Sequence, residues 1–334
     1  MLQAPQLWGR PLILVMAYPG LIHAFAWALG GYRESGRGLL ALYASLAMLL
    51  AGSIPVLAIR ALILMRQADG HVPARGALYL MVAVPSLFSL TYTLTRIVIP
   101  DRHYAALSTL WIAAWAAVGL LLYYRKRTSV APSHDTDVKR LRIVHGTVAL
   151  LLLCGFLIPH LVNHDLAAWS VTLHATAMKW LRLWYRSAWV EPVLLGLFLV
   201  MIGTGVRMAV HHSRRGMDAF RAVQLASGVY LGVFIASHVF ATLYGRYKGA
   251  ETDWFFAAGP TSLLDGSLLG RLIPHYFFAV VCLSLHVACG LRVVMLQHGA
   301  ARPLADRVMY GLTATGVMVT AVLMAALLGF HFVT

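Results

Sequence analysis

Histidines gather in the second half of this chain, inside runs of apolar residues. The 334 residues include 15 histidines. The apolar runs of the first 128 residues contain only His23, whereas eight histidines lie within or at the edges of the later runs. These eight are His145, His160, His164, His211, His212, His238, His275 and His286. An imidazole at membrane depth is costly without a partner, which is a metal ion, a haem iron, a proton relay or a hydrogen bond.

Composition identifies the setting of these histidines as a lipid bilayer. The chain is 60% hydrophobic and 12% charged, about half the charge of a typical soluble domain. Its apolar runs repeatedly reach the ~20 residues that a helix needs to cross a bilayer. We predict an all-α integral membrane protein with about nine transmembrane helices, the last five forming a C-terminal bundle. The predicted spans are 11–30, 39–65, 77–99, 105–124, 143–163, 192–210, 222–244, 274–296 and 309–330.

The net charge of +15 follows the ends of these spans. With the N-terminus on one side, that side collects 17 basic residues and the other side collects 10. The positive-inside rule then predicts a multi-pass protein of a bacterial-type cytoplasmic membrane, with a cytoplasmic N-terminus and an external C-terminus. Because no soluble basic domain is present, we expect the bilayer and not nucleic acid as the partner of this charge. The most basic stretch separates a four-helix region, 1–128, from a five-helix domain, 142–334, through a cytoplasmic linker, 129–141.

Several kinds of site are excluded by what the spans do not contain. The three cysteines, Cys154, Cys282 and Cys289, fall inside spans without metal-ligand spacing. No carboxylate lies inside a predicted span, which argues against a proton or cation transporter. Glycine-rich phosphate loops, nucleophile elbows and HExxH motifs are also absent from the sequence.

His160 and His238 are predicted to lie at the same depth on two different helices. They stand about 17 and about 16 residues into two spans that both run outward, a difference of only ~1.5 Å in depth. Two imidazoles facing each other among apolar side chains suit the axial positions of a b-type haem. His164 cannot ligate the same iron from the same helix face, but it is the alternative to His160. Pro159, directly before His160, weakens the helix at this point.

Other haem patterns fit the sequence less well. Some cytochromes place two histidines 13 or 14 residues apart on each of two helices. Here His145 and His160 are 15 apart, and no second helix repeats this spacing. The sequence has no CxxCH motif for covalent haem attachment. His145, His211, His212 and His275 sit at the ends of predicted spans, where we expect interfacial histidines.

Four stretches of the C-terminal part resemble a known family. They are "FLIPHLVNH", "EPVLLGLFLVMIGTGVRM", "QLASGVYLGVFIASHVFATLYGR" and "YFFAVVCLSLHVACGLRVV". In these residues the region of about 142–334 resembles the five-helix cytochrome b subunit of succinate dehydrogenases and fumarate reductases. It is also similar to haem-bearing membrane anchors of some bacterial adenylate cyclases. The resemblance implies an outer haem held by His160 and His238, in agreement with their depth.

The same resemblance implies an inner haem, with His286 as one ligand. The family's second helix supplies the other ligand, but this chain carries Thr204 there. The inner site is then empty, five-coordinate through His286, or lost. We therefore expect one haem b, and two if a histidine such as His211 or His212 replaces the missing ligand.

Basic and aromatic residues accompany the predicted outer haem level. Arg182, Arg186 and Arg246 are candidates to pair with haem propionates, although anchoring at the membrane interface explains them equally well. The segment 167–189 carries tryptophans at helical spacing and is predicted to be an interfacial helix. It forms either an aromatic belt or a roof over a haem or quinone pocket.

The expected function is electron transfer by a membrane-bound b-type cytochrome. Single electrons would pass between a partner subunit and membrane quinone, so the chain is at most a non-catalytic subunit of a quinone oxidoreductase. The alternative is a membrane sensor, anchor or assembly subunit whose haem is structural or absent. A redox partner favours the first, a signalling partner favours the second, and a homo-oligomer fits either. The front stretch "SLTYTLTRIVI" is similar to "SLHVACGLRVV" without its histidine, and the front region has no assigned role.

Overall fold

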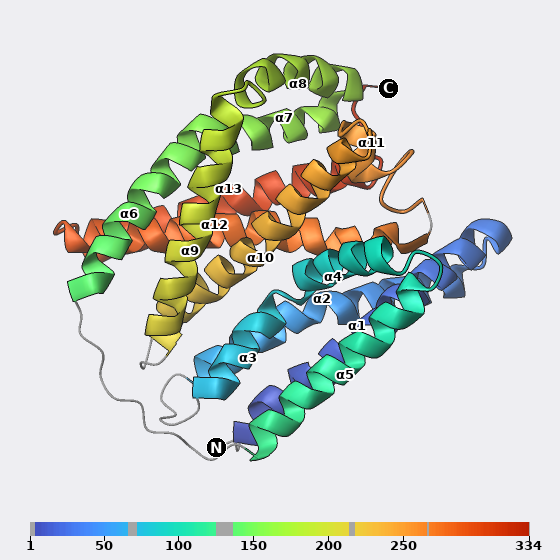
Figure 1. Ribbon diagram of the computed structural model, residues 1–334, viewed down its shortest axis with the longest axis horizontal. Coiled ribbons are helices and arrows are strands. Elements are labelled where there is room, and N and C mark those ends of the chain that lie inside the picture. Colours follow the sequence, from blue (N-terminus) through green and yellow to red (C-terminus); the bar gives the residue numbers. More distant parts are fainter. Residues whose placement is uncertain (1–3, 66–71, 125–135, 214–217, 266, 334) are drawn as a thin grey trace.

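The described part of the chain is helical, and no strand occurs in it (Figure 1). The computed structural model describes residues 4–65, 72–124, 136–213, 218–265 and 267–333. Within these ranges, eight helices are long and apolar enough to cross a membrane, and a bent helix pair accounts for a ninth span. Each predicted span coincides with one of these elements. An all-α membrane protein of about nine spans is therefore confirmed.

The front region contains four spans, one of which is broken. Its helices are α1 (Ala4–Ser35), α2 (Gly38–Leu64), α3 (Val72–Val82), α4 (Val84–Val98) and α5 (His103–Tyr124). α3 and α4 meet at a 70° bend and together form the span predicted at 77–99. The bend falls at Ala83, two residues before Pro85. Proline lacks an N–H donor and its ring clashes with the carbonyl four residues earlier, so the helix cannot continue through it undistorted.

The first span of the back part combines three consecutive helical segments. They are α6 (Thr136–Leu152), a π-helical turn η1 (Leu153–Leu157) and α7 (Ile158–Trp169). The remaining elements are α8 (Val171–Tyr185), α9 (Val190–Ser213), α10 (Ala219–Tyr247), α11 (Trp254–Ala258), η2 (Ser267–Arg271), α12 (Leu272–Gln297) and α13 (Arg302–Leu327). Residues 129–135 of the predicted linker lie outside the described ranges, and 136–141 form the first turns of α6.

The helix expected after the first back span is present as α8. Ser170 separates it from α7, because its extended backbone ends one helix and its hydroxyl accepts a hydrogen bond from Thr172 N at 3.2 Å, capping the next. α8 exposes Trp180 and Trp184. α7, α8 and the C-terminus lie together at one end of the molecule, away from the N-terminus (Figure 1).

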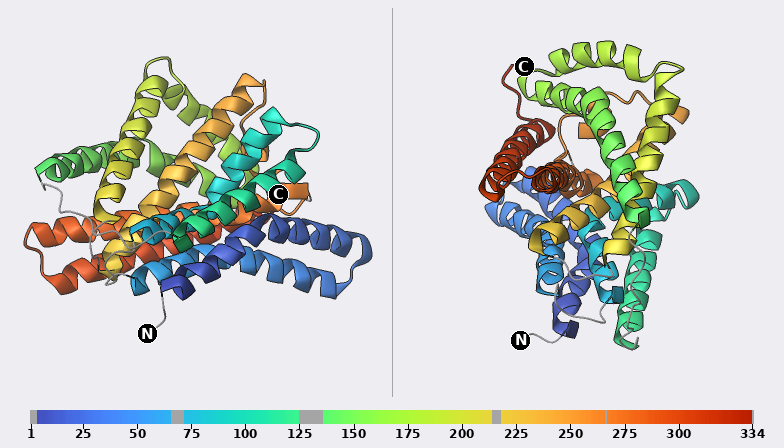
Figure 2. Two further views of the ribbon diagram at one scale, coloured as in Figure 1. Left: turned by 60° about the horizontal axis from the view of Figure 1, so that its bottom comes forward. Right: turned by 90° about the vertical axis from the view of Figure 1, so that its left-hand side faces the viewer.

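The front and back regions share one hydrophobic core. Tyr18, Phe88 and Trp111 of the front helices belong to the same buried cluster as Tyr230 of α10 and Phe278 of α12. α1 pairs with α2, and α12 pairs with α13 (Figure 2). α10 contacts α3 and α4 of the front region as well as α9 and α12 of the back region. The outer surfaces of many helices expose large apolar side chains, as contact with lipid requires.

Candidate functional site

Histidine rings contact one another at five places in the described ranges. Three contacts lie within one helix or between the consecutive helices α7 and α8: His160–His164, His164–His174 and His211–His212. The other two join different transmembrane spans: His160–His238 and His145–His286. In both of these pairs the ring centroids lie 6.2 Å apart. The fold therefore brings two histidine pairs together from positions remote in the sequence.

Aromatic neighbours support both rings of the first pair, from α7 and α10. His160 stacks on Phe156 at a centroid distance of 4.9 Å, and His238 stacks on Phe234 at 5.4 Å. Each phenylalanine stands four residues before its histidine, which places the two side chains on one helix face. The two imidazole planes meet at 74°. Stacking therefore holds the rings in defined orientations across the gap between the helices.

The separation of these rings fits an iron ion between them. A histidine nitrogen binds a transition metal at about 2.0 Å. The ring centroid lies roughly 1.1 Å behind that nitrogen, because the ring bonds are about 1.33 Å long. Two imidazoles on opposite sides of one iron thus have centroids about 6.2 Å apart. His160 and His238 match this distance, so the separation of the two rings fits the ligand spacing of a haem with two histidine ligands.

A cavity of about 640 Å³ adjoins His160 and His238. Residues of α4, η1, α7, α8, α9, α10 and α12 line it, and its size lies within the range of cofactor sites. Buried polar atoms of its lining residues that lack a hydrogen-bond partner in the described ranges include Ser89 Oγ, Asn163 Oδ1, His174 Nε2 and His275 Nδ1. Buried polar atoms normally have such a partner. The lining is therefore suited to a ligand that carries polar groups as well as a large apolar body.

His164 turns toward the other end of this site. Its ring stacks with His174 of α8 at 5.3 Å and lies 6.1 Å from Trp254. His174 Nδ1 donates a hydrogen bond to the Asn163 carbonyl oxygen at 2.7 Å. Burial lowers the pKa of His174 below its ordinary value of 6.5, the Asn163 carbonyl opposes this shift, and Arg182 adds to it. His160, and not His164, is the ring that faces His238.

The arginines expected near haem propionates border the cavity, and each has a protein partner. Arg246 at the end of α10 forms an ion pair with Glu191 at the start of α9, with Nη2 3.2 Å from Oε2. Arg182 donates to the Thr252 carbonyl oxygen at 2.8 Å, and Arg186 donates to Thr252 Oγ1 at 2.6 Å. These contacts tie α8, α9 and the α10–α11 connection together beside the cavity.

The contribution of α4 to this cavity was not predicted. Ser89, Tyr92 and Arg96 of α4 border it, and the Arg271 guanidinium lies 3.9 Å from the Tyr92 ring centroid. Ser89, Tyr92 and Arg96 belong to the stretch "SLTYTLTRIVI", which contains no histidine. A serine, a tyrosine and an arginine on an apolar span give no recognisable ligand pattern, so only the packing of α4 on α10 and α12 reveals their place.

The second pair joins the first back span to α12 at a different level. His145 Nδ1 lies 2.9 Å from Thr204 Oγ1 of α9, and His286 Nδ1 lies 2.9 Å from the Gln224 carbonyl oxygen of α10. The imidazole planes meet at 75°. α6 begins at Thr136, so the helix extends into the basic segment and His145 lies within it. The expected position of His145 at the membrane edge stays a prediction.

The other histidines expected at span ends differ from one another. His275 is buried, with its ring 4.8 Å from Phe234 and 5.0 Å from Tyr276. It is therefore enclosed by protein, near the start of α12. His211 and His212 lie in the last turn of α9 and contact each other, as expected for the end of a span. The histidine ring that contacts His286 is that of His145.

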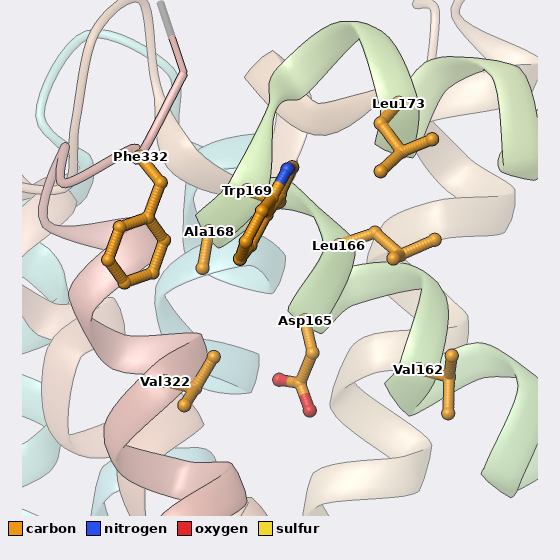
Figure 3. A pocket seen from close by; sticks show the side chains of 8 residues that line it. All are labelled: Val162, Asp165, Leu166, Ala168, Trp169, Leu173, Val322 and Phe332. Carbon is orange, nitrogen blue, oxygen red and sulfur yellow. The ribbon is translucent and has the colours of Figure 1, made fainter.

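A second hollow of about 480 Å³ lies between α7, α8, α13 and the C-terminal residues (Figure 3). Trp169 and Phe332 face each other across it at 5.4 Å, and Asp165 is the acidic group in its lining. Phe332 N donates to the Ala168 carbonyl oxygen at 2.8 Å, which fixes the chain end there. None of the paired histidines lines this hollow, so it is separate from both histidine sites.

No protein-family model, curated protein or solved structure matches this chain. The chemistry of the site therefore has to follow from its own residues.

Proposed function

We propose that this chain is a membrane-bound b-type cytochrome that transfers single electrons between a partner protein and quinone in the bilayer. The observation that carries the proposal is the 6.2 Å separation of His160 and His238 across two transmembrane segments. The polar and apolar lining of the adjoining cavity supports it. So does the resemblance of residues 142–334 to membrane cytochrome b subunits. The basic asymmetry of the sequence favours a cytoplasmic membrane of bacterial type, with the N-terminus inside.

A bound haem would supply one-electron chemistry by cycling between ferric and ferrous iron. The chain's own contribution is to bind and orient it. His160 and His238 supply neutral imidazole nitrogens, and Phe156 and Phe234 restrict the rotation of both rings. The apolar side chains of the cavity would keep water away from the iron of a bound haem. Guanidinium groups such as that of Arg182 would offer positive charge to the haem propionates. Arg246 contributes less to this charge, because it is paired with Glu191.

An absorption spectrum of the purified full chain tests the proposal. Protein made in a haem-replete host should show, after dithionite reduction, the α-band of a low-spin b-type haem. His160→Ala and His238→Ala should each abolish the low-spin signal of this site. His298→Gln is the matched control, because His298 is exposed at the end of α12 and bonds only its own helix in the described ranges. Haem-free wild-type protein would overturn the proposal.

Reduction of the haem by a quinol distinguishes a role in electron transfer from a structural role. If the chain serves a quinone pool, a short-chain quinol should reduce the haem within seconds without dithionite. A haem that binds normally but accepts no electrons from quinols of low or high potential would instead support a sensor or assembly subunit. Copurification of a flavoprotein or iron–sulfur partner would identify the other end of the path.

A further inference from the structure

A second pair of histidines repeats the geometry of the first. His145 and His286 have the same 6.2 Å centroid separation as His160 and His238, and their ring planes meet at 75° instead of 74°. Both rings are half-buried. No other contact between two histidine rings in the described ranges joins two transmembrane spans. The repeated distance is the one expected for two imidazoles on opposite sides of an iron.

We propose that His145 and His286 are the axial ligands of a second haem, at the opposite level of the membrane from the first. This inference deepens the proposed function and rests on it. It differs from the expectation drawn from family resemblance, in which the ligand opposite His286 belongs to the helix that carries Thr204. Here the first back span supplies a ligand at both levels, His145 in α6 and His160 in α7.

The hydrogen bonds of the two rings leave the required nitrogen free on each. The Gln224 carbonyl can only accept, so His286 Nδ1 donates to it and Nε2 keeps its lone pair. The Thr204 hydroxyl donates to the Val200 carbonyl oxygen at 2.7 Å, so it accepts from His145 Nδ1. Both imidazoles therefore present an unprotonated Nε2. Fixing the tautomer through the other nitrogen is the usual arrangement for a metal-binding histidine.

A glycine makes room for the His286 ring. A Cβ atom added at Gly228 of α10 would lie 2.8 Å from His286 Cε1 and 3.0 Å from Nδ1. The ring is already fixed by its hydrogen bond to Gln224, one turn earlier on the same helix. Any larger residue at Gly228 would therefore displace the ring from this position. On α9, a Cβ at Gly205 would make only an ordinary van der Waals contact with His145 Cε1, at 3.5 Å.

The π-helical turn η1 puts both ligands of the first back span in register. Four turns of α-helix contain about 14 residues, so histidines with that spacing share a face. His145 and His160 are 15 apart, and the wider turn η1 absorbs one extra residue. The two rings consequently face α12 and α10 from one side, ~21 Å apart along the helix. Two haems at these levels would form an electron path across the bilayer.

Haem content of the full chain, measured with the iron content, tests the assignment. The wild type should bind two low-spin haems, and His145→Ala or His286→Ala should halve the haem per protein while the other signal persists. Near-perpendicular axial rings should give strongly anisotropic low-spin EPR signals for both. A wild type with one haem, lost in His160→Ala but unchanged in both inner variants, would overturn this inference and leave the proposed function standing. Protein without any haem would overturn both.

A matched pair of glycine variants separates ligand loss from misfolding. Gly228→Ala should displace the His286 ring and halve the haem content, with the outer haem retained. Gly203→Ala is the control, because Gly203 is exposed on α9 and a Cβ there meets no atom within 4 Å. The control should keep both haems. If Gly228→Ala also keeps two low-spin haems, His286 is not a ligand.

Discussion

At the scale of single residues, the direction of each ring decides between candidates that the sequence leaves equal. His160 and His164 are one helical turn apart and both half-buried. Only His160 faces His238, whereas His164 packs against His174 and Trp254. Spacing alone cannot separate them, because positions i and i+4 share a helix face. The distinction depends on which ring meets α10, and that is a property of tertiary packing.

A substitution at His164 should therefore spare the outer haem. His164→Ala removes a ring that lies 4.6 Å from His160 but does not face His238. We expect haem per protein to stay unchanged, with a small shift of the redox potential as the polarity beside His160 changes. His160→Ala, measured in parallel, should lose the low-spin signal. The reverse outcome, with the signal lost in His164→Ala and retained in His160→Ala, would move the ligand one turn along α7.

At the scale of elements, hydropathy predicts where the helices are but not where they deviate. The nine apolar runs coincide with the spans, because burial of apolar length in a bilayer dominates their placement. The sequence did not reveal the bend at Ala83 or the π-helical turn at Leu153–Leu157. Pro85 signals the first only weakly, since membrane helices tolerate proline. The π-helical turn has no characteristic amino-acid composition. Without it, the 15-residue spacing of His145 and His160 is unfavourable for placing both side chains on one face of a helix.

The register provided by η1 can be tested by changing its length. A Cβ atom added at Gly155 would meet no atom within 4 Å, so this position is not tightly packed. Deleting Gly155 should convert the π turn to regular α-helix and keep His145 and His160 on one helix face. Inserting one alanine after Gly155 should instead rotate His145 by about 100° relative to His160. We expect two low-spin haems in the deletion variant and one in the insertion variant. Equal haem content in both variants would show that the turn does not set the register.

At the scale of the whole molecule, the front region is part of the site and not an appendage. Its α4 lines the larger cavity, and its core is continuous with α10 and α12. The sequence suggested a boundary at residues 129–141 because charge interrupts the apolar runs there. Chain connectivity and packing differ in this case, since helices on both sides of that boundary bury Tyr18, Phe88 and Tyr230 against one another. The described helices of the front and back regions therefore pack against each other across the predicted boundary.

The charge distribution predicts the orientation of this assembly in the membrane, and this orientation would decide which of the two proposed haem levels faces outward. With 17 basic residues on the N-terminal side and 10 on the other, the positive-inside rule places the α8–α9 turn outside and the α12–α13 turn inside. Single cysteines at two exposed positions, Ala188→Cys and Ala301→Cys, probe these turns. A membrane-impermeant maleimide should label Ala188→Cys in intact cells and Ala301→Cys only after permeabilisation. The unmodified chain is the background control, because its three cysteines lie within spans. Labelling in the opposite order would place the His160–His238 pair at the cytoplasmic side and the His145–His286 pair outside.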